Sequence, residues 1–403
     1  MSGVRPFQES DSSQVADLHR RGFKTGAVLS PRLERAYERY FKTIFLNNPC
    51  ASPGVSSLVF EEAGGAIVGF LGVTPQPMIF RDKPVLAAVS SQLIVDPVRR
   101  STLAGVQLLK TFLSGPQDLS LADEANETAR EIWRGLGGHS AVPQSIQWVK
   151  VFRPGDLLLS RLVKSGQAEE RRRLGWKAAL AAPFCRIGDA VAGALPGNHF
   201  SAPPATGTVA EPTVEGQVSC LAELTKRWPL RPAYDSRSLR WRLGIMERHT
   251  ERGTLRKGIV RNSKDEIVGW YLYYAKRRGL GEVVQLCATA NSQEEVLSHL
   301  FFDAWENRVA ALCGRLEPEF MDGMRKKKCL LYNRGFWMLV HSRNSAILQT
   351  IRCGDAFVSR LEGEYPSHFG KAAFHVKEGE QEAWCEDRVN HAPLANTPIG
   401  THP

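Results

Sequence analysis

The sequence predicts an α/β protein made of two units, each with helices packed on a mixed β-sheet. Three observations carry this prediction: helical and strand periods alternate along the chain, the length suits more than one core, and short segments of the first half recur in the second. The chain has 403 residues, of which 43% are hydrophobic and 23% charged. This composition is typical of globular proteins and excludes a wholly disordered or coiled-coil chain. Because single cores rarely grow beyond about 250 to 300 residues, the length predicts two domains.

The first predicted unit covers residues 1–154. Apolar residues recur at every third or fourth position in its helices and in alternating or short continuous runs in its strands. Turns rich in glycine and proline, such as residues 63–65 and 115–116, separate these segments. In chain order we expect a helix beginning at Asp11 or Ser12, a helix over 31–45, strands over 57–61, 66–73 and 85–95, a helix over 103–112, a strand over 119–122, a helix over 126–136 and a strand over 146–152.

The second predicted unit covers residues 215–369 and repeats this alternation. Residues 66–70 and 266–270 share the run Ile-Val-Gly followed by an aromatic residue, and each run follows a turn. A second pair of similar segments, 133–137 and 332–336, stands in the same order, which indicates duplication. In this unit we expect strands over 257–261, 267–274, 282–288, 314–317 and 337–341 and a helix over 293–311.

Between the two units, residues 155–214 predict a basic amphipathic helical linker, because apolar residues near helical spacing are interleaved with arginine and lysine. We favour packing of its apolar side on a neighbouring domain, as in other globular proteins. The alternative is a helix that lies flat on an anionic membrane. The polar tail over 370–403 is expected to be disordered.

The charge balance favours anionic partners. Lys and Arg total 52 against 42 Asp and Glu, a formal net charge of +10. Nucleotides, phosphorylated cofactors, nucleic acid and acidic lipids all suit this sign, although the basic clusters, among them residues 325–328, are also typical of solvated faces. No RNA-binding motif is present, so nucleic acid is not expected as a partner.

The cysteines and the first residues predict a cytoplasmic protein without a metal site. The eight cysteines are scattered, with no CxxC pair and no histidine at metal-ligand spacing. The first residues do not read as a secretory signal, and no apolar run is long enough to span a bilayer. If the linker contacts lipid, the protein would be peripheral at the inner membrane face.

The most informative stretch runs from Ser91 to Leu109. A strand enters a turn of polar and small residues, and an amphipathic helix follows directly. The unpaired backbone N–H groups at such a helix start, together with the helix dipole, form a binding site for phosphate. The residues predicted to hold phosphate are Arg99, Arg100, Ser101, Thr102, Leu103, Ala104 and Gly105.

This stretch resembles motif A of the GNAT N-acyltransferase superfamily. The motif places Arg or Gln, two residues, Gly, one residue, and Gly or Ala after a strand and bulge, and here residues 99–104 fit it except that Thr102 replaces the first glycine. Residues 126–137 resemble the family's next helix, and the resemblance covers about residues 4–153. It implies two GNAT-like domains, the second degenerate because residues 288–293 lack the arginine and glycines of the turn.

The resemblance also implies a co-substrate and its site. Acetyl-CoA or another acyl-CoA would bind with its pantetheine arm along the strand and its pyrophosphate at the turn, for transfer of the acyl group to an amine of a small-molecule acceptor. The strand residues implied are Leu93, Ile94 and Val95, and Asn126 would contact the cofactor.

The catalytic groups depart from the family's pattern. Trp133 stands where many members have a tyrosine that acts as the general acid. Residues 90–92 lack the glutamate that often acts as the base. Acyl transfer to an amine needs a group that accepts the proton of the nucleophile. Glu124 is the first candidate for this base and Asp123 the second, because both follow the next strand, close to the expected thioester.

Two other functions remain open from the sequence. A catalytically inactive tandem module could bind a partner or an anionic membrane surface through its basic linker. A FemAB-like aminoacyltransferase, which uses charged tRNA, would fit the duplication and the positive charge.

Overall fold

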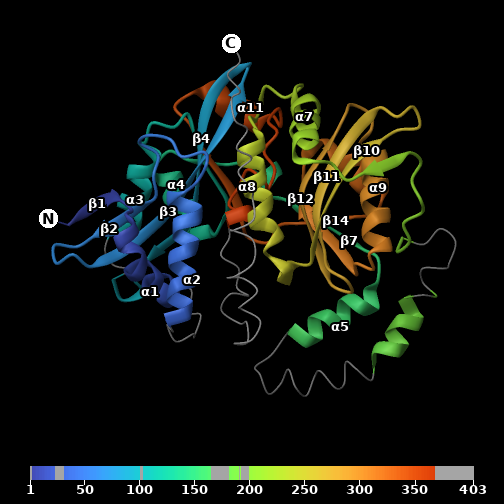
Figure 1. The fold of residues 1–403 in the computed structure, drawn as a ribbon, viewed down its shortest axis with the longest axis horizontal. Coiled ribbons are helices and arrows are strands. Elements are labelled where there is room, and N and C mark those ends of the chain that lie inside the picture. The colour runs from blue at the N-terminus through green and yellow to red at the C-terminus, as the bar shows by residue number, and fades with distance from the viewer. Residues whose placement is uncertain are drawn as a thin grey trace, which may run out of the picture. The chain divides into compact units, whose positions relative to one another are not determined.

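The computed structural model describes residues 2–22, 31–99, 103–164, 181–189, 191 and 199–367. It confirms the predicted α/β class, because two mixed sheets, covered by helices, account for the core (Figure 1). The buried apolar side chains form separate clusters on the two faces of each sheet. No helix in the described part of the chain is both long enough and apolar enough to cross a bilayer.

The first sheet holds the strands of the first unit except β7 (Gln147–Val151), together with β9 (Leu230–Pro232) and β15 (Trp337–His341) from the second half. Its order is β1 (Gly3–Pro6), β2 (Leu58–Glu61), β3 (Ile67–Phe80), β4 (Lys83–Val95), β5 (Leu119–Ala125), β15 and β6 (His139–Ser140), and β9 pairs with β3. β3 is antiparallel to β2 and β4, whereas β5 is parallel to β4. Its helices are α1 (Ser12–Gly22), α2 (Pro31–Phe41), α3 (Ala104–Leu113) and α4 (Glu127–Gly135).

The second sheet repeats this plan. Its order is β8 (Thr208–Ala210), β10 (Thr254–Arg261), β11 (Ile267–Ala275), β12 (Leu280–Ala288), β13 (Ala311–Arg315), β7 (Gln147–Val151) and β14 (Leu330–Tyr332). β11 is antiparallel to β10 and β12, and β13 is parallel to β12. The helices of this half are α7 (Val214–Thr225), α8 (Ser236–Glu247), α9 (Gln293–Glu306), α10 (Met321–Lys326) and α11 (Ser345–Arg352).

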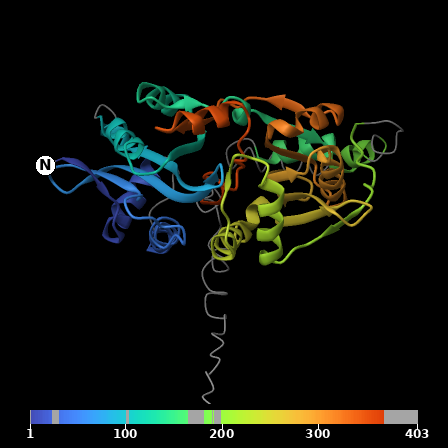
Figure 2. The same ribbon diagram turned by 90° about the horizontal axis from the view of Figure 1, so that it is seen from above.

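The two halves exchange strands: the first half gives β7 to the second sheet, and the second half gives β15 and the short β9 to the first sheet. β7, at the end of the first predicted unit, pairs with β13 and β14 of the second sheet, where Figure 1 draws it beside the orange strands. β15 in turn lies between β5 and β6 of the first sheet, so that the orange part of the chain meets the blue and teal part in Figure 2. Each sheet is therefore completed by a strand from the other half. The boundaries at residues 154 and 215 therefore stay a prediction about which segments are related by duplication.

The matching Ile-Val-Gly runs occupy matching places. Gly69 in β3 lies under α3, and a Cβ there would come within 2.9 Å of Leu108 Cδ1. Gly269 in β11 lies under α9, and its Cβ would come within 2.1 Å of Val296 Cγ2. In both sheets the glycine lets the helix approach the strand closely. The shared strand order and this shared contact support the duplication inferred from sequence.

Element bounds differ from the predictions mainly where long-range pairing decides them. β3 extends through Pro75 and Pro77 to Phe80, because it pairs along its whole length with β4. α9 ends at Glu306 rather than at residue 311, because Arg308 adopts a φ of 54° and turns the chain into β13. β13 accordingly begins at Ala311, three residues before the predicted start.

The linker contains α5 (Pro154–Lys164) and a helix over 181–189. The Asp189 carboxylate accepts hydrogen bonds from the backbone N–H groups of Gly155 and Asp156, at 2.8 and 2.9 Å, and so ties the second helix to the start of α5. Phe184 and Ile187 are nevertheless 77% and 63% exposed. These two side chains do not pack on a neighbouring domain, and for the rest of the linker the packing that we favoured from sequence stays a prediction.

Candidate functional site

β4 and β5 separate toward their carboxyl ends. Their parallel pairing covers Ala87 to Val89 on β4 and stops there, whereas β4 continues to Val95 and β5 to Ala125. Among the described residues, no strand pair joins the two strands beyond that point. Over its last residues, including Leu93, Ile94 and Val95, the β4 edge that faces β5 therefore has no strand partner among the described residues.

A bulge in β4 marks the place where the strands separate. Phe70 of β3 pairs with Ile94 and Gly72 pairs with Ser91, so β4 holds an extra residue there. Gln92 lies in this bulge with a φ of 53°, and its amide nitrogen donates a hydrogen bond to the Tyr40 hydroxyl. Because a bulge bends and twists its strand, it turns the end of β4 away from β5.

The turn after β4 leads into α3 as the sequence predicts. The Asp96 backbone N–H donates to the Val68 carbonyl at 2.9 Å, and the Asp96 carboxylate accepts from Arg21 of α1 at 2.7 Å. These contacts fix the start of the turn. Arg100, Ser101 and Thr102 lie outside the described residues, and of Arg99 only the backbone is described.

Among the described residues, no side chain caps the backbone donors at the start of α3. Leu103 occupies the N-cap position, where no side-chain hydrogen bond is formed, and it is 66% exposed. Ala104 is buried in the core, and a Cβ on Gly105 would come within 3.3 Å of Val95 Cγ2. The first amides of α3 are thus held rigidly near the end of β4.

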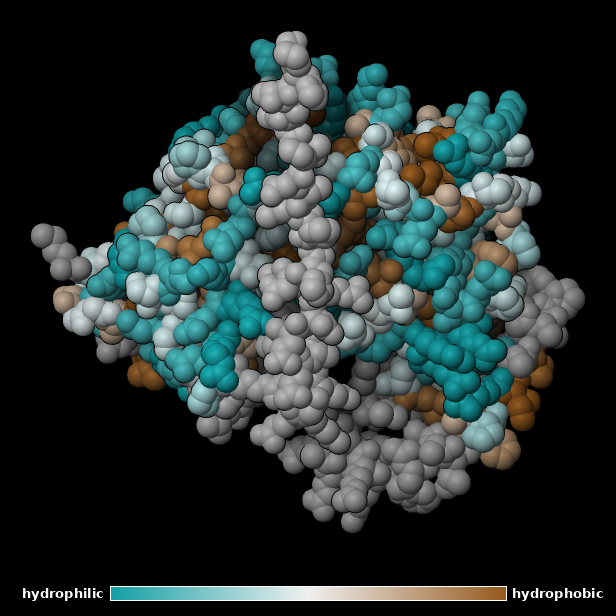
Figure 3. All heavy atoms as spheres, in the orientation of Figure 1, coloured by the Kyte–Doolittle hydropathy of each residue, from teal (hydrophilic) through white to brown (hydrophobic). Residues whose placement is uncertain are grey.

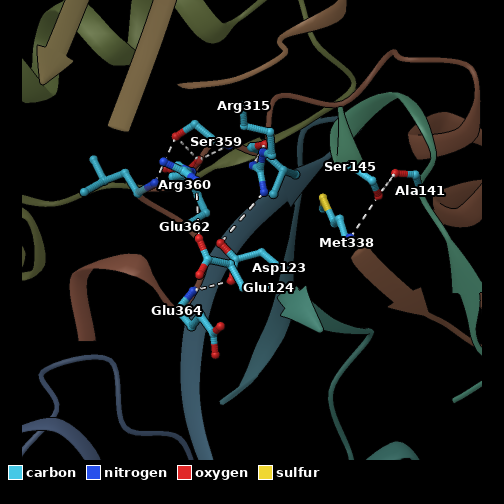
Figure 4. A network of polar contacts seen from close by, with 12 residues as sticks. Asp123, Glu124, Ala141, Ser145, Arg315, Met338, Ser359, Arg360, Glu362 and Glu364 are labelled. Carbon is cyan, nitrogen blue, oxygen red and sulfur yellow. Dashed lines mark hydrogen bonds and ion pairs between the residues drawn. The ribbon is translucent and has the colours of Figure 1, made fainter. Parts of the chain in front are cut away.

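The structure brings the predicted carboxylates to the same edge. Asp123 lies in β5 and is buried: its Oδ1 accepts from the Glu364 backbone N–H at 2.8 Å, and its Oδ2 lies 3.8 Å from Arg315 Nη1 (Figure 4). Burial raises the pKa of Asp123 to about 6, although Arg315 opposes this. Asp123 therefore holds the segment 359–367 against β5.

Glu124 is more open to solvent. Its side chain is 34% exposed, and its Oε1 accepts a hydrogen bond from Arg360 Nη2 at 3.3 Å. Arg360 also donates to the Gln147 side chain of β7. Glu124 is thus oriented by a buried guanidinium and still accessible to an incoming molecule.

Asn126 begins α4. Its side-chain oxygen accepts from the Ala129 backbone N–H at 2.9 Å, so it is the N-cap of that helix. Because β4 and β5 are parallel, Asn126 lies at the same edge of the sheet as the start of α3. Trp133, further along α4, is buried and packs 6.1 Å from the ring of Phe112, so it belongs to the core.

Sequence reasoning missed the residues that surround the two carboxylates. Arg315 and Arg360 come from the second half, and Glu362 accepts hydrogen bonds from Ser359 Oγ at 2.7 Å and from Gln285 Nε2 at 3.1 Å. Burial raises the pKa of Glu362 to about 8. The only local signal was an unusual density of charged residues over 359–364, in a segment with apolar neighbours.

The corresponding turn of the second half differs. Ser292, with Glu295 three residues later, has the sequence pattern that predicts a capping box. Its side chain does not cap α9 and instead accepts a hydrogen bond from Thr289 Oγ1 at 3.0 Å. The capping-box prediction is therefore wrong. Ser292 has a φ of −102° and a ψ of 7°, which lie outside the extended conformation typical of a capping residue.

The sequence matches no protein-family model and no curated protein sequence. Solved structures do resemble the chain. A probable N-acyltransferase from Enterococcus faecalis V583 has a TM-score of 0.51 at 10% identity, covering 85% of this chain and 73% of that one. GCN5-related N-acetyltransferases from Kribbella flavida and Anabaena variabilis both have a TM-score of 0.50, at 14% and 12% identity, covering 84% and 86% of this chain and 70% and 74% of theirs.

The chain has the GNAT fold. The bulge of β4 and the start of α3 lie within residues 91–109, the stretch that resembles motif A of that superfamily. The fold prediction is thereby confirmed. At 10 to 14% identity the comparison establishes the fold, and the roles of individual residues have to be argued from the site itself.

Proposed function

We propose that the protein is an acyl-CoA-dependent N-acyltransferase that transfers an acyl group, such as acetyl, to an amine of a small acceptor. The supporting observation is the open end between β4 and β5, which lies beside the uncapped amides of α3. A strand edge with free backbone groups suits the amides of a pantetheine arm, and helix N–H donors suit a pyrophosphate. The solved structures of similar fold are named as N-acyltransferases, which agrees with this proposal.

The residues present fit such a co-substrate. The buried Ser91 Oγ, next to the bulge, has no hydrogen-bond partner among the described residues, so a polar ligand group can satisfy it. Leu93, Ile94 and Val95 would align the pantetheine arm through their backbone. The turn from Arg99 to Gly105, with Arg100, Ser101, Thr102, Leu103 and Ala104, would hold the pyrophosphate, and Asn126 would flank it.

The co-substrate supplies an activated thioester, and the chain supplies position and proton transfer. The amine nitrogen of the acceptor attacks the thioester carbonyl, the new C–N bond forms, and the C–S bond breaks. Glu124, held by Arg360, accepts the proton that the amine loses. Asp123 is the second candidate for this base, but its contact with the Glu364 backbone favours a positioning role. The proton returns to the departing thiolate through solvent or a neighbouring group.

A charge placed at the exposed N-cap tests the co-substrate site. Leu103→Glu puts a carboxylate beside the proposed pyrophosphate, and we expect the Kd for acetyl-CoA, measured by titration calorimetry, to rise at least tenfold. Leu103→Gln has nearly the same shape without the charge and should change the Kd about twofold or less. Because an acidic residue at a helix N-terminus stabilises the helix, Leu103→Glu should not lower the Tm.

Several acyl chain lengths should be compared in the same titrations, because the chain that this protein prefers is part of the proposal. If the wild type binds no acyl-CoA at millimolar concentration, the proposed enzymatic function is contradicted. Equal binding of acetyl-CoA by both Leu103 variants would contradict the proposed pyrophosphate site at the start of α3.

A second candidate role has its own observation. The helix over 181–189 exposes Phe184 and Ile187, and Figure 3 shows brown atoms at the lower right, where Figure 1 draws this helix and α5. The sequence over 155–191 is rich in arginine and lysine. We propose that this surface contacts an anionic membrane, since apolar side chains flanked by basic residues bind acidic lipid interfaces.

Sedimentation with vesicles tests this contact. The wild type should sediment with vesicles of phosphatidylserine and phosphatidylcholine but not with phosphatidylcholine alone. Phe184→Glu should reduce the bound fraction severalfold. Val142→Glu alters another exposed apolar residue, 55% exposed and far along the chain, and should bind as the wild type does. Equal binding by the two variants would contradict the proposal.

A further inference from the structure

A polar cavity of about 770 Å³ lies on the second sheet, apart from the candidate acyl-CoA site. Its walls are residues 199–206, the first half of α9, the end of α10 with residues 326–328, the turn at Asn262 and Ser263, and Lys150 of β7. No residue of β4, β5, β12 or β13 lines it. Its volume is within the range of sites that bind small molecules.

Lys150 is buried in the wall of this cavity without a carboxylate partner. Its Nζ donates hydrogen bonds to the backbone carbonyls of His199 at 2.8 Å and Lys327 at 2.6 Å. The residue is 5% exposed, and no Asp or Glu oxygen among the described residues lies within ion-pair distance of its Nζ. Buried lysines are normally paired with an acid, because an uncompensated charge is costly to bury.

Lys327 adds a second half-buried ammonium. Its Nζ donates to Ser298 Oγ at 2.8 Å, so its contact in α9 is a neutral hydroxyl. Burial lowers the pKa of both Lys150 and Lys327, and the Lys327 charge lowers that of Lys150 further. Of the neighbouring basic residues, Lys326 is paired with Glu294, and Lys328 is exposed.

The remaining lining suits a phosphorylated organic molecule. Glu295 is the one acidic residue of the lining, against four lysines. The Thr206 hydroxyl can donate to a phosphate oxygen, whereas the Asn262 amide and the Ser298 hydroxyl already donate to Glu266 and to the Glu294 carbonyl. The segment 202–205 and Phe301 offer an apolar surface. The run of basic residues over 325–328, which the sequence alone suggested to be a solvated face, thus forms part of a concave site.

We propose that this cavity binds the phosphate group of a small organic phosphate, with Lys150 and Lys327 as its principal ligands. A dianionic phosphate would neutralise the two ammonium groups that the fold leaves without acidic partners, and charge-assisted hydrogen bonds of this kind are among the strong ones. The proposal does not depend on acyl transfer, because the cavity and the β4 site share no residue.

Titration calorimetry with inorganic pyrophosphate, in a phosphate-free buffer of low ionic strength, tests this site on the full chain. Wild type and variants are each titrated in a Leu103→Glu background, so that the proposed pyrophosphate turn before α3 does not contribute. Lys327→Gln is the test variant, because it removes one charge from the wall while Lys150, which supports two backbone carbonyls, stays in place. We expect the Kd for pyrophosphate to rise about tenfold, the effect of losing one charge-assisted hydrogen bond. Lys83→Gln removes an exposed charge from β4 and should leave the Kd unchanged.

A second experiment distinguishes a lipid headgroup from a free metabolite as the source of the phosphate. Vesicles carrying phosphatidic acid are mixed with the Phe184→Glu protein, so that the linker helix does not contribute, and with Phe184→Glu combined with Lys327→Gln. Loss of binding in the double variant would assign a lipid headgroup, whereas binding of soluble pyrophosphate alone would assign a free metabolite. If neither pyrophosphate nor the vesicles bind, or if wild type and Lys327→Gln bind pyrophosphate with equal affinity, the proposal is overturned. Acetyl-CoA binding by Lys327→Gln at the β4 site should stay as in the wild type.

Discussion

Three acidic side chains near the contact between the halves are buried deeply enough to change their protonation. Burial raises the pKa of Asp123 to about 6, that of Glu317 to about 7 and that of Glu362 to about 8. Arg315 and Arg360 offset part of the cost for Asp123 and Glu317, but burial is the larger effect. The folded protein therefore holds protons that the unfolded chain would release at neutral pH.

Glu317 gives a pH-dependent test of this burial. Because its pKa is higher in the folded state, the folded state binds more protons between about pH 4.5 and 7, and stability falls as the pH rises through this window. In Glu317→Gln the fall between about pH 5 and 8 should be smaller by roughly 2 to 3 kcal/mol. Urea denaturation at both pH values measures it.

The matched control is Glu131→Gln, which alters an exposed carboxylate of α4. Its pH dependence should follow that of the wild type. If Glu317→Gln behaves in the same way as this control, burial does not control the protonation of Glu317.

Glu124 carries the catalytic proposal at this scale. Glu124→Gln keeps the size of the side chain and an acceptor oxygen for Arg360, but it cannot take up a proton. With an accepted amine, we expect kcat to fall by about 100-fold or more, while the Kd for acyl-CoA changes little. Thiol release over a panel of amines measures turnover. Asp123→Asn, which retains an acceptor for the Glu364 N–H, should lose less activity; the opposite order would transfer the role of base to Asp123.

At the scale of elements, each half depends on one close approach between a helix and its sheet. β3 and β11 both place glycine under the helix that follows the next strand, α3 or α9. Of these two glycines, Gly269 has the smaller space, because a Cβ there would also lie 2.9 Å from the Cys287 carbonyl oxygen. Side chains at this position would push α9 away from the sheet.

Gly269→Ala should therefore destabilise the protein by about 1 to 3 kcal/mol in urea denaturation. Adding Val296→Ala, which shortens the side chain that the new methyl would meet, should restore part of the loss. Gly64→Ala is the control, since a Cβ at Gly64 meets no atom within 4 Å. Equal stability of Gly269→Ala and this control would show that α9 adjusts its position without cost.

At the scale of the whole molecule, the exchange of β7 and β15 makes each sheet depend on the other half. β7 forms its pairs with β13 and β14, and β15 forms its pairs with β5 and β6. Contacts such as that between Arg360 and Glu124 cross the same boundary. The two halves should consequently lose their structure together.

We therefore expect the full chain to unfold in one transition, with coincident midpoints by tryptophan fluorescence and far-UV circular dichroism. A fragment of residues 1–154 lacks β15 and leaves β7 without partners, so it should show no cooperative unfolding. A well-folded fragment with its own sharp transition would contradict the interdependence of the sheets.

Much of the local structure could be predicted from the sequence because its causes are local. The alternation at residues 66–73, the glycine turn before it and the change of period after Asp96 depend on neighbours within a few residues. The same kind of signal located the strand, turn and helix that form the candidate acyl-CoA site. Glu124 and Asp123 were found for the same reason, since they follow the short apolar run that begins β5.

The sequence by itself thus determined the α/β class and most of the strands and helices, and it is the source of the proposal that a ligand binds at the end of β4. Only the tertiary structure decided that β7 and β15 change sheets, that Arg315 and Arg360 surround the two carboxylates, and that Lys150 lies beside Lys327 in a cavity. These pairings join residues far apart in the chain. Their free energy comes from burial and contact in three dimensions, and such contacts leave no periodic pattern in the sequence from which they could be predicted.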